Sequence, residues 1–213
     1  IFVPDYKVDY FQQRYAGPNV IIEGLPAERV SRQDIFFNYF DSSLINSRTL
    51  AIHKLEKLTK DKNILKFLFS FFLRTFLGRF NAVKKLIRWA DLKSINTAGV
   101  KGYFEKYSPA AVFATDVFNN DDVRFLAEAK KSGVKTVGMP GSWDHFVKRY
   151  EPVKLDTLLV WNEPVKKEAV TLQGYRAENV HVTGSAYYDL YVRREIYQSR
   201  EEFCKKFGFD PRK

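Results

Sequence analysis

The chain has 213 residues, of which 45% are apolar and 16% aromatic, and a formal net charge of +10 at pH 7. That length is enough for one hydrophobic core with an appended lobe, and the apolar content excludes an intrinsically disordered chain. The single cysteine, Cys204, excludes a disulfide framework and a cysteine-based metal cluster, and it favours a reducing compartment. Because the sequence starts at Ile1 without a methionine and ends where a further strand could begin, we expect a fragment or an excised domain.

The positive charge is concentrated in one segment. Residues 48–101 hold thirteen Lys or Arg but only three acids, Glu56, Asp61 and Asp91. This segment accounts for the whole net charge, because the rest of the chain has 22 basic and 22 acidic residues. The protein is therefore predicted to carry one basic module on an otherwise neutral body.

Two short strands are predicted near the amino end. Residues 1–4 and 20–23 are mainly apolar, and the turn residues 17–19 precede the second of them. Residues 9–15, between the two strands, favour a short helix.

From about residue 32 to residue 92 the pattern is helical and rich in aromatic residues. Residues 64–77 contain ten apolar side chains in fourteen. Lys66, Ser70 and Arg74 fall at helical spacing within them, so one narrow polar stripe is predicted beside a wide apolar arc. A helix of this length is too short to span a bilayer, which needs about 20 residues.

Three interpretations of this basic lobe compete. It is a buried helix that packs against a sheet with its charges solvated, or a lobe on a membrane surface, with aromatic residues in the headgroup region and Lys or Arg on anionic lipid. Nucleic acid is a third partner, but no known nucleic-acid module is found. We favour the membrane, because the whole net charge lies beside the most apolar helix. The predicted membrane contacts come from that helix and from the polar face of the next one: Lys66, Arg74, Arg79, Lys84, Lys85 and Arg88.

Four apolar, β-branched runs, each followed by a turn of small or polar residues, predict a parallel sheet. They lie at residues 111–115, 135–139, 157–161 and 180–183. Helical patterns separate the runs, as in repeated βαβ units. We expect the first of these strands to be buried and His181, in the last one, to lie in the core. The predicted fold is α/β: a Rossmann-like parallel sheet with an inserted basic, aromatic-rich helical lobe.

The functional site is predicted beyond the carboxyl ends of these strands, where ligands bind in parallel sheets. The loop from 140 to 155 is unusually long for its position, and such loops are often functional. Trp143 is expected to pack under this loop, with stacking on a sugar ring as the alternative. Asp116 is expected either to bind substrate hydroxyls or to cap the following helix. Asp144 is expected either to take part in catalysis or to cap backbone N–H groups of its own loop. The residues expected at this edge are Asp116, Ser142, Trp143, Asp144, His145, Asn162, Gly184 and Ser185.

No dinucleotide-binding, phosphate-loop, zinc-protease or serine-hydrolase motif is present in the sequence. The three histidines, His53, His145 and His181, lack metal-ligand spacing. We therefore expect no metal site and no cofactor in this chain.

A series of short motifs follows the predicted strands in order: Ser142-Trp143-Asp144, Val160-Trp161-Asn162, and Val182-Thr183-Gly184-Ser185 with Asp189. The series, within residues 108–195, resembles the amino-terminal half of bacterial surface-polysaccharide glycosyltransferases related to CDP-glycerol glycerophosphotransferases. The sequence departs from that family at His145, where asparagine is usual, and at residues 146–149, where a Thr…Lys-Gly run is expected.

The resemblance implies one half of a GT-B fold, in which two Rossmann-like domains face each other across a cleft. Residues 1–31 and 97–195 would then form the acceptor-side domain. Residues 32–96 would form the inserted lobe, and residues 196–213 a linker helix toward a second domain, on which the nucleotide-activated donor binds.

This family further implies transfer from a nucleotide-sugar or CDP-glycerol donor to a lipid-linked or polysaccharide acceptor, at the cytoplasmic face of the inner membrane. Asp144 and His145 are the candidate bases for the acceptor hydroxyl, because their loop leaves a strand end. The other residues of the predicted edge would bind the acceptor. The alternatives are a non-catalytic membrane- or carbohydrate-binding module and a sugar-nucleotide epimerase of the same architecture.

Overall fold

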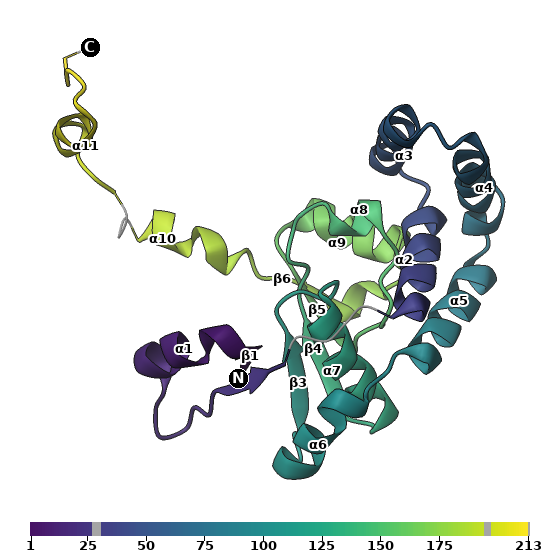
Figure 1. Ribbon diagram of the computed structural model, residues 1–213, viewed down its shortest axis with the longest axis horizontal. Helices are drawn as coiled ribbons and strands as arrows, with labels where there is room; N and C mark the ends of the chain where they lie inside the picture. The colour runs from purple at the N-terminus through teal and green to yellow at the C-terminus, as the bar shows by residue number, and fades with distance from the viewer. Residues whose placement is uncertain (27–30, 194–196, 213) are drawn as a thin grey trace. The chain divides into compact units, whose positions relative to one another are not determined.

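The computed structural model describes residues 1–26, 31–193 and 197–212 (Figure 1). The protein is mixed α/β with parallel sheets, as the sequence predicts. Internal contacts divide the chain into two compact units, Ile1–Phe37 and Asn38–Lys213. The assignment of residues 1–31 to the same domain as residues 97–195 stays a prediction.

The first unit contains two short parallel strands and a helix. Its elements are β1 (Phe2–Pro4), a 3-10 helix (Asp5–Lys7), α1 (Val8–Tyr15) and β2 (Glu23–Leu25). The helix predicted at residues 9–15 is confirmed. The second strand starts three residues later than predicted, because the N–H of Val20 donates a hydrogen bond to the carbonyl of Gly17 (3.0 Å) and closes a turn there.

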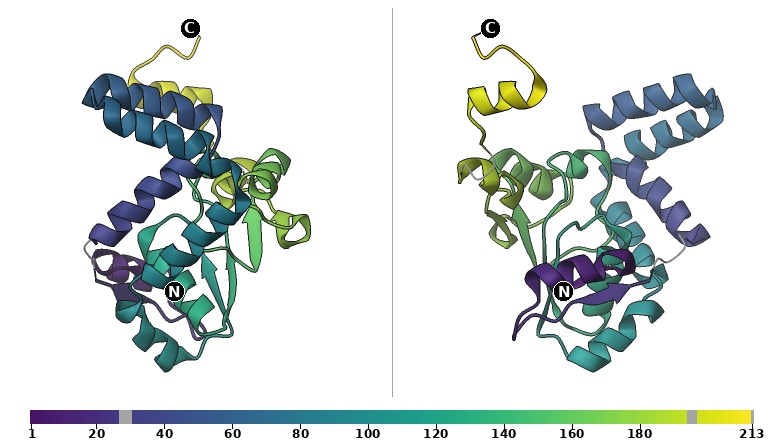
Figure 2. Two further views of the ribbon diagram at one scale, coloured as in Figure 1. Left: turned by 90° about the vertical axis from the view of Figure 1, so that its right-hand side faces the viewer. Right: turned by 60° about the vertical axis from the view of Figure 1, so that its left-hand side comes forward.

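The segment from about residue 32 to residue 92, which the sequence predicts to be helical, consists of helices in the structure. It contains α2 (Arg32–Leu44), α3 (Arg48–Asp61), α4 (Ile64–Thr75), a 3-10 helix (Leu77–Arg79) and α5 (Asn81–Ser94), and α6 (Ala98–Tyr107) follows. α3 begins where Ser47 Oγ accepts a hydrogen bond from the N–H of Leu50, and Asn63 caps α4 in the same way. The cap at Asn63 therefore marks the break between α3 and α4. The two helices lie side by side (Figure 2).

The main sheet has four parallel strands in the order β3-β4-β5-β6. The strands are β3 (Ala111–Ala114), β4 (Lys135–Gly138), β5 (Thr157–Val160) and β6 (Val180–Val182), and the helices after β3, β4 and β5 are α7 (Asn120–Lys131), α8 (His145–Lys148) and α9 (Glu163–Thr171). Each strand lies within a run predicted from the sequence. Because all pairs are parallel, the four carboxyl ends lie along one edge of the sheet.

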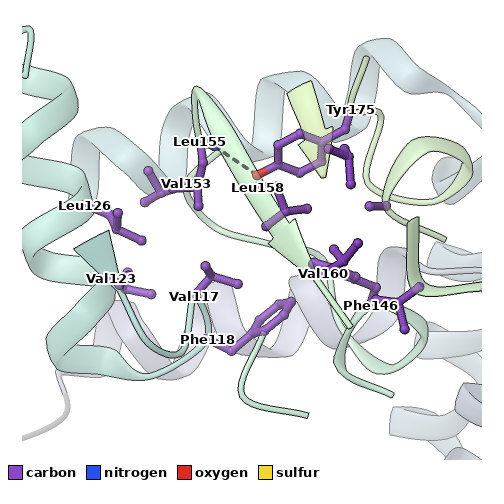
Figure 3. Packing of buried hydrophobic residues seen from close by; sticks show 14 of the residues in the cluster. Val117, Phe118, Val123, Leu126, Phe146, Val153, Leu155, Leu158, Val160 and Tyr175 are labelled. Atoms are coloured by element: carbon purple, nitrogen blue, oxygen red, sulfur yellow. Dashed lines mark hydrogen bonds between the residues drawn. The ribbon is translucent and has the colours of Figure 1, made fainter. Parts of the chain in front are cut away.

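One face of the sheet carries the main hydrophobic core. Leu158 and Val160 of β5 are fully buried there with Leu126 of α7 (Figure 3). Tyr175, which precedes β6, is also buried, and its Oη accepts a hydrogen bond from the N–H of Leu155 (2.9 Å). Burial of apolar surface stabilises a fold by roughly 25 cal/mol per Å², so this cluster holds the strands and the loops between them in place.

The opposite face of the sheet is partly exposed. Phe113 of β3 is 55% exposed and His181 of β6 is exposed. The predictions of a buried first strand and of a core histidine are therefore wrong. Both α7 and α9 contribute to the core on the other face, as expected when neighbouring strands are joined by crossovers of one hand. Alternate residues of each strand point toward the face that these helices leave open.

The C-terminal segment is made of short helices. They are two 3-10 helices (Ala177–Asn179 and Ala186–Tyr188), α10 (Asp189–Val192) and α11 (Arg200–Phe207). α11 starts with a capping box between Ser199 and Glu202 and ends at Gly208, whose φ is 70°. The helix expected within residues 196–213 is observed as α11, and its role as a linker stays a prediction. The predicted boundary between residues 195 and 196 lies outside the described residues.

Candidate functional site

The loops that follow the four strands meet at the carboxyl edge of the sheet. Backbone hydrogen bonds join neighbouring loops: the N–H of Val117 donates to the carbonyl of Met139 (3.0 Å), and the N–H of Thr183 to that of Val160 (3.0 Å). Asp116, residues 141–145, Asn162 and residues 184–185 all follow these strand ends. The predicted convergence of these segments on one edge is therefore observed.

Asp116 and His145 lie close together at this edge, after β3 and β4. Nδ1 of His145 lies 3.5 Å from Asp116 Oδ1, and the same oxygen accepts hydrogen bonds from the N–H groups of Phe118 and Gly141, both at 3.1 Å. Burial opposes ionisation of the carboxyl, but the close contact with His145 and the hydrogen bonds from the two N–H groups outweigh it and keep the pKa of Asp116 below its usual value. Asp116 is therefore a carboxylate at neutral pH.

Gly141 allows this arrangement to be compact. A Cβ atom at this position would lie 2.5 Å from Asp116 Oδ2, well inside van der Waals contact. Only a glycine lets the backbone of the 140–155 loop approach the carboxylate this closely. The loop and the end of β3 are thus fitted to each other through one residue that carries no side chain.

The ring of His145 is held on a second side by an aromatic contact. Its centroid lies 5.1 Å from that of Phe118 in an edge-to-face arrangement. The Nδ1 atom is buried and makes no well-aligned hydrogen bond to the described residues, so Asp116 is its charged neighbour, and the side chain as a whole keeps 28% of its area exposed. If Nδ1 carries the proton that faces Asp116, Nε2 is left as the basic nitrogen of the neutral ring.

Asp144 is engaged on both carboxylate oxygens. Oδ2 pairs with Lys148, one turn further along, and Oδ1 accepts a hydrogen bond from Ser142 Oγ (2.9 Å). Burial opposes ionisation, but Lys148 and Ser142 outweigh it and lower the pKa of Asp144. The geometry therefore favours Asp116, rather than Asp144, as the partner of His145. Sequence analysis did not single out Lys148, although its i, i+4 spacing from Asp144 on α8 indicates such a pair.

Trp143 lies on the surface of the same loop. Its side chain is 61% exposed, so the expectation that it packs under the loop is wrong. The indole is free to contact a ligand, and Trp143 lies two residues before His145 in the sequence. This leaves the alternative interpretation, stacking on a sugar ring, as the one that the structure permits.

The remaining predicted residues of the edge have simpler surroundings. Asn162 caps α9, with Oδ1 accepting a hydrogen bond from the N–H of Val165 (3.0 Å). Gly184 has a φ of 81° with open space around it, so a left-handed turn explains it. Ser185 is partly exposed. In the parts of the chain that the structure describes, no group of His, Cys, Asp or Glu could hold a metal ion.

The predicted membrane contacts do not all lie on the surface. Lys66, Arg79 and Lys85 are exposed, and Arg74 and Lys84 are partly so. Arg88 is buried, which contradicts its predicted contact with lipid. Its Nε and Nη2 donate hydrogen bonds to the carbonyls of Glu151 (2.9 Å) and Gln173 (3.1 Å), and its guanidinium stacks 4.0 Å over the ring of Tyr150.

α4 turns Ser70, the middle residue of its polar stripe, and the apolar Leu73 inward. Ser70 is buried, and its Oγ lies 3.0 Å from that of Ser43 on α2, whereas Leu65 is 81% exposed. The interpretation of this segment as a buried helix packed against the sheet is therefore wrong. No helix in the described ranges is long and apolar enough to cross a membrane. The exposed apolar residues of α4 are Ile64, Leu65, Leu68, Phe69, Phe71 and Phe72.

Comparison with protein-family models, with curated proteins and with solved structures finds no match to this chain. The family resemblance carried by Ser142-Trp143-Asp144 and the later motifs stays a prediction.

Proposed function

We propose that this protein is the acceptor-binding half of a GT-B glycosyltransferase, or glycerophosphotransferase, of surface-polysaccharide biosynthesis. The observation that carries the proposal is the pairing of Asp116 with His145 at the carboxyl edge of the sheet. An exposed tryptophan, Trp143, stands on the same loop. A histidine oriented by a carboxylate beside an exposed aromatic ring suits the deprotonation of a hydroxyl on a sugar or polyol.

The transfer requires a base that takes the proton of the acceptor hydroxyl as its oxygen attacks the donor. In this proposal Nε2 of His145 accepts that proton, while Asp116 orients the ring through Nδ1 and stabilises the imidazolium that forms. The acceptor oxygen bonds to the anomeric carbon, or to the phosphorus, of the donor. The bond to the departing nucleotide breaks, and the nucleotide keeps the electron pair. The donor, a nucleotide-sugar or CDP-glycerol, binds the second domain that the family resemblance implies.

We further propose that α4 rests on an anionic membrane at its cytoplasmic face, where a lipid-linked acceptor would be found. The apolar arc of α4 is exposed, and Lys66, Arg79 and Lys85 lie on the surface of the same group of helices. An amphipathic helix of this kind inserts its apolar side into the headgroup region. Each basic residue near an anionic surface adds about 1 kcal/mol of attraction.

Acceptor binding is tested by saturation-transfer NMR, with phosphate-free hexosamine disaccharides as probes, so that only the acceptor site is tested. The chain has two tryptophans of nearly equal exposure, Trp143 at 61% and Trp89 at 59%, which provides a matched pair of variants. We expect Trp143→Ala to weaken binding about tenfold, a loss of about 1.4 kcal/mol, and Trp89→Ala to leave it unchanged. Equal binding by both variants would contradict the proposed site.

Membrane association is tested by sedimentation with vesicles of phosphatidylcholine alone or mixed with phosphatidylglycerol. We expect binding to the anionic vesicles and a strong loss with Leu65→Glu on α4. Leu190→Glu on α10, a second exposed leucine, serves as the control and keeps binding. Equal binding to neutral and anionic vesicles, or no binding to either, refutes the membrane role.

A further inference from the structure

A basic pocket of about 520 Å³ lies between α5 and the loops that precede β5 and β6. Lys84, Lys85 and Trp89 line it from α5, and Lys130, Lys154 and Gly174 line it from the sheet side. Since Lys154 and Gly174 come just before β5 and β6, the pocket lies at the amino ends of the strands. The Asp116–His145 pair lies at the carboxyl ends, so the basic pocket is a separate site.

The back wall of the basic pocket is fixed by a buried arginine. Arg88 donates to the carbonyls of Glu151 and Gln173 and stacks on Tyr150. These contacts join α5 to two loops of the sheet. The lysines that line the pocket around Arg88 are therefore attached to backbone segments that these contacts hold in place. This lowers the entropy cost of binding a ligand between the lysines.

The pocket holds positive charge without a matching acid. Five of its lining residues are Lys or Arg, and none is Asp or Glu. Lys130 pairs with Asp156 outside the lining, and Lys154 donates to the carbonyl of Gly174. The side-chain ammonium groups of Lys84 and Lys85 have no ion-pair or hydrogen-bond partner within the described ranges. Two ammonium groups are thus available to a ligand.

The cations of the pocket disfavour one another. Burial lowers the pKa of Lys84, and Arg88 lowers it further. Burial and then Arg88 also lower the pKa of Lys154. The nearby Glu151 counters this only in part, because burial raises its own pKa to about 7 and leaves it partly protonated at neutral pH. An anion in the pocket would relieve this repulsion.

We propose that the basic pocket binds a phosphate or diphosphate ester. A dianion or trianion matches several converging lysines better than a single carboxylate does, and lysine is a common phosphate ligand. The volume accommodates a phosphate group together with part of the molecule that carries it, and the exposed ring of Trp89 forms a wall against which that part can pack. The ester belongs to a soluble metabolite or to a lipid headgroup, and the two sources are separated by experiment.

The first arm of the test measures binding of inorganic pyrophosphate by isothermal titration calorimetry at low ionic strength. Lys84→Gln combined with Lys154→Gln should weaken binding at least tenfold. The control combines Lys93→Gln with Lys167→Gln, which removes the same charge from exposed positions outside the pocket, and it should bind like the wild-type chain. Binding by the wild-type chain that weakens only in the pocket variant supports a soluble phosphate ester.

The second arm uses vesicles of phosphatidylcholine with and without phosphatidic acid. Sedimentation with phosphatidic acid that is lost in the pocket variant, and retained in the charge-matched control, assigns the site to a lipid phosphate. The proposal is overturned if neither probe binds, or if the pocket variant and the control lose binding equally.

A measurement on the wild-type chain guards against a variant that folds poorly. Amine-reactive labelling followed by mass spectrometry should show Lys84 and Lys154 protected by whichever probe binds, with Lys93 unprotected. Equal labelling with and without that probe also overturns the proposal. Because Asp116→Asn lies at the other edge of the sheet, it should leave the binding of the phosphate probe unchanged, so failure of this site and failure of the proposed acceptor site are distinguishable.

Discussion

α7 and α4 are both twelve-residue amphipathic helices, yet α7 buries seven of its residues and α4 buries two. On α7, Leu126 packs into the core beneath the sheet. On α4, Ser70 and Leu73 are buried, whereas Leu65 and Phe72 are exposed. An amphipathic pattern therefore predicts that a helix has a polar and an apolar face, but the neighbouring elements decide which residues are buried. For α7 the neighbour is the apolar face of the sheet. For α4 the neighbours include α2, where Ser43 contacts Ser70, and they leave most of the helix exposed.

The largest effect expected from this comparison is on stability. Leu158, in the core against α7, is fully buried, whereas Leu68 on α4 is 53% exposed. We expect Leu158→Ala to cost about 2–5 kcal/mol of unfolding free energy and Leu68→Ala to stay within about 0.5 kcal/mol of wild type. Urea denaturation followed by circular dichroism measures both. A large loss with Leu68→Ala would show that the outer face of α4 is covered.

A second prediction concerns the junction where α5 meets the loops of the sheet. Burial raises the pKa of Glu151 to about 7 from 4.5. The folded state thus binds a proton that the unfolded state has released, and this stabilising contribution, complete below pH 4.5, is lost as the pH rises through 7. At 1.36 kcal/mol per pKa unit, the loss is up to about 3 kcal/mol.

Glu151→Gln tests this directly, because an amide cannot ionise. We expect the variant to be more stable than wild type at pH 8 and no more stable at pH 5, as measured by urea denaturation at both values. Glu201→Gln on the exposed start of α11 is the control and should leave the pH dependence unchanged. If the difference in unfolding free energy between the wild-type chain and Glu151→Gln is the same at both pH values, the pKa of Glu151 is not raised.

A third prediction concerns the loop beside His145. Because a Cβ on residue 141 would clash with Asp116, Gly141→Ala should destabilise the protein by about 1–3 kcal/mol and displace the carboxylate from His145. Gly102→Ala, within α6 and with open space around it, should instead stabilise it by about 0.5–1 kcal/mol. Denaturation midpoints compare the two. A neutral Gly141→Ala would mean that the loop can move away from β3 without cost.

The smallest effect is expected at a helix cap on the same edge. Asn162 bonds the N–H of Val165, so Asn162→Ala should cost about 1 kcal/mol and leave acceptor binding unaltered. Ser185→Ala should cost less, because the Ser185 side chain makes no cap hydrogen bond at the start of its 3-10 helix. If Asn162→Ala weakens acceptor binding while stability is retained, Asn162 binds the ligand as well as capping α9.

The elements of this protein can be predicted from local sequence because their determinants are local. Alternating or helical apolar spacing, the caps at Asn119 and Asn162 and the stop at Gly208 each act within a few residues. Parallel connection of the four strands follows from the helices between them. That connection is what brings Asp116 and His145 to one edge, so the location of the candidate site could also be predicted.

Only the tertiary structure decided which groups meet and which faces turn outward. The pairing of His145 with Asp116 in place of Asp144, the burial of Arg88 against Glu151 and the exposure of Trp143 all depend on residues far away in the sequence. An individual side chain has the same local pattern whether it is covered or exposed. Its burial is set by the surface that folding places opposite to it, and no local pattern contains that information.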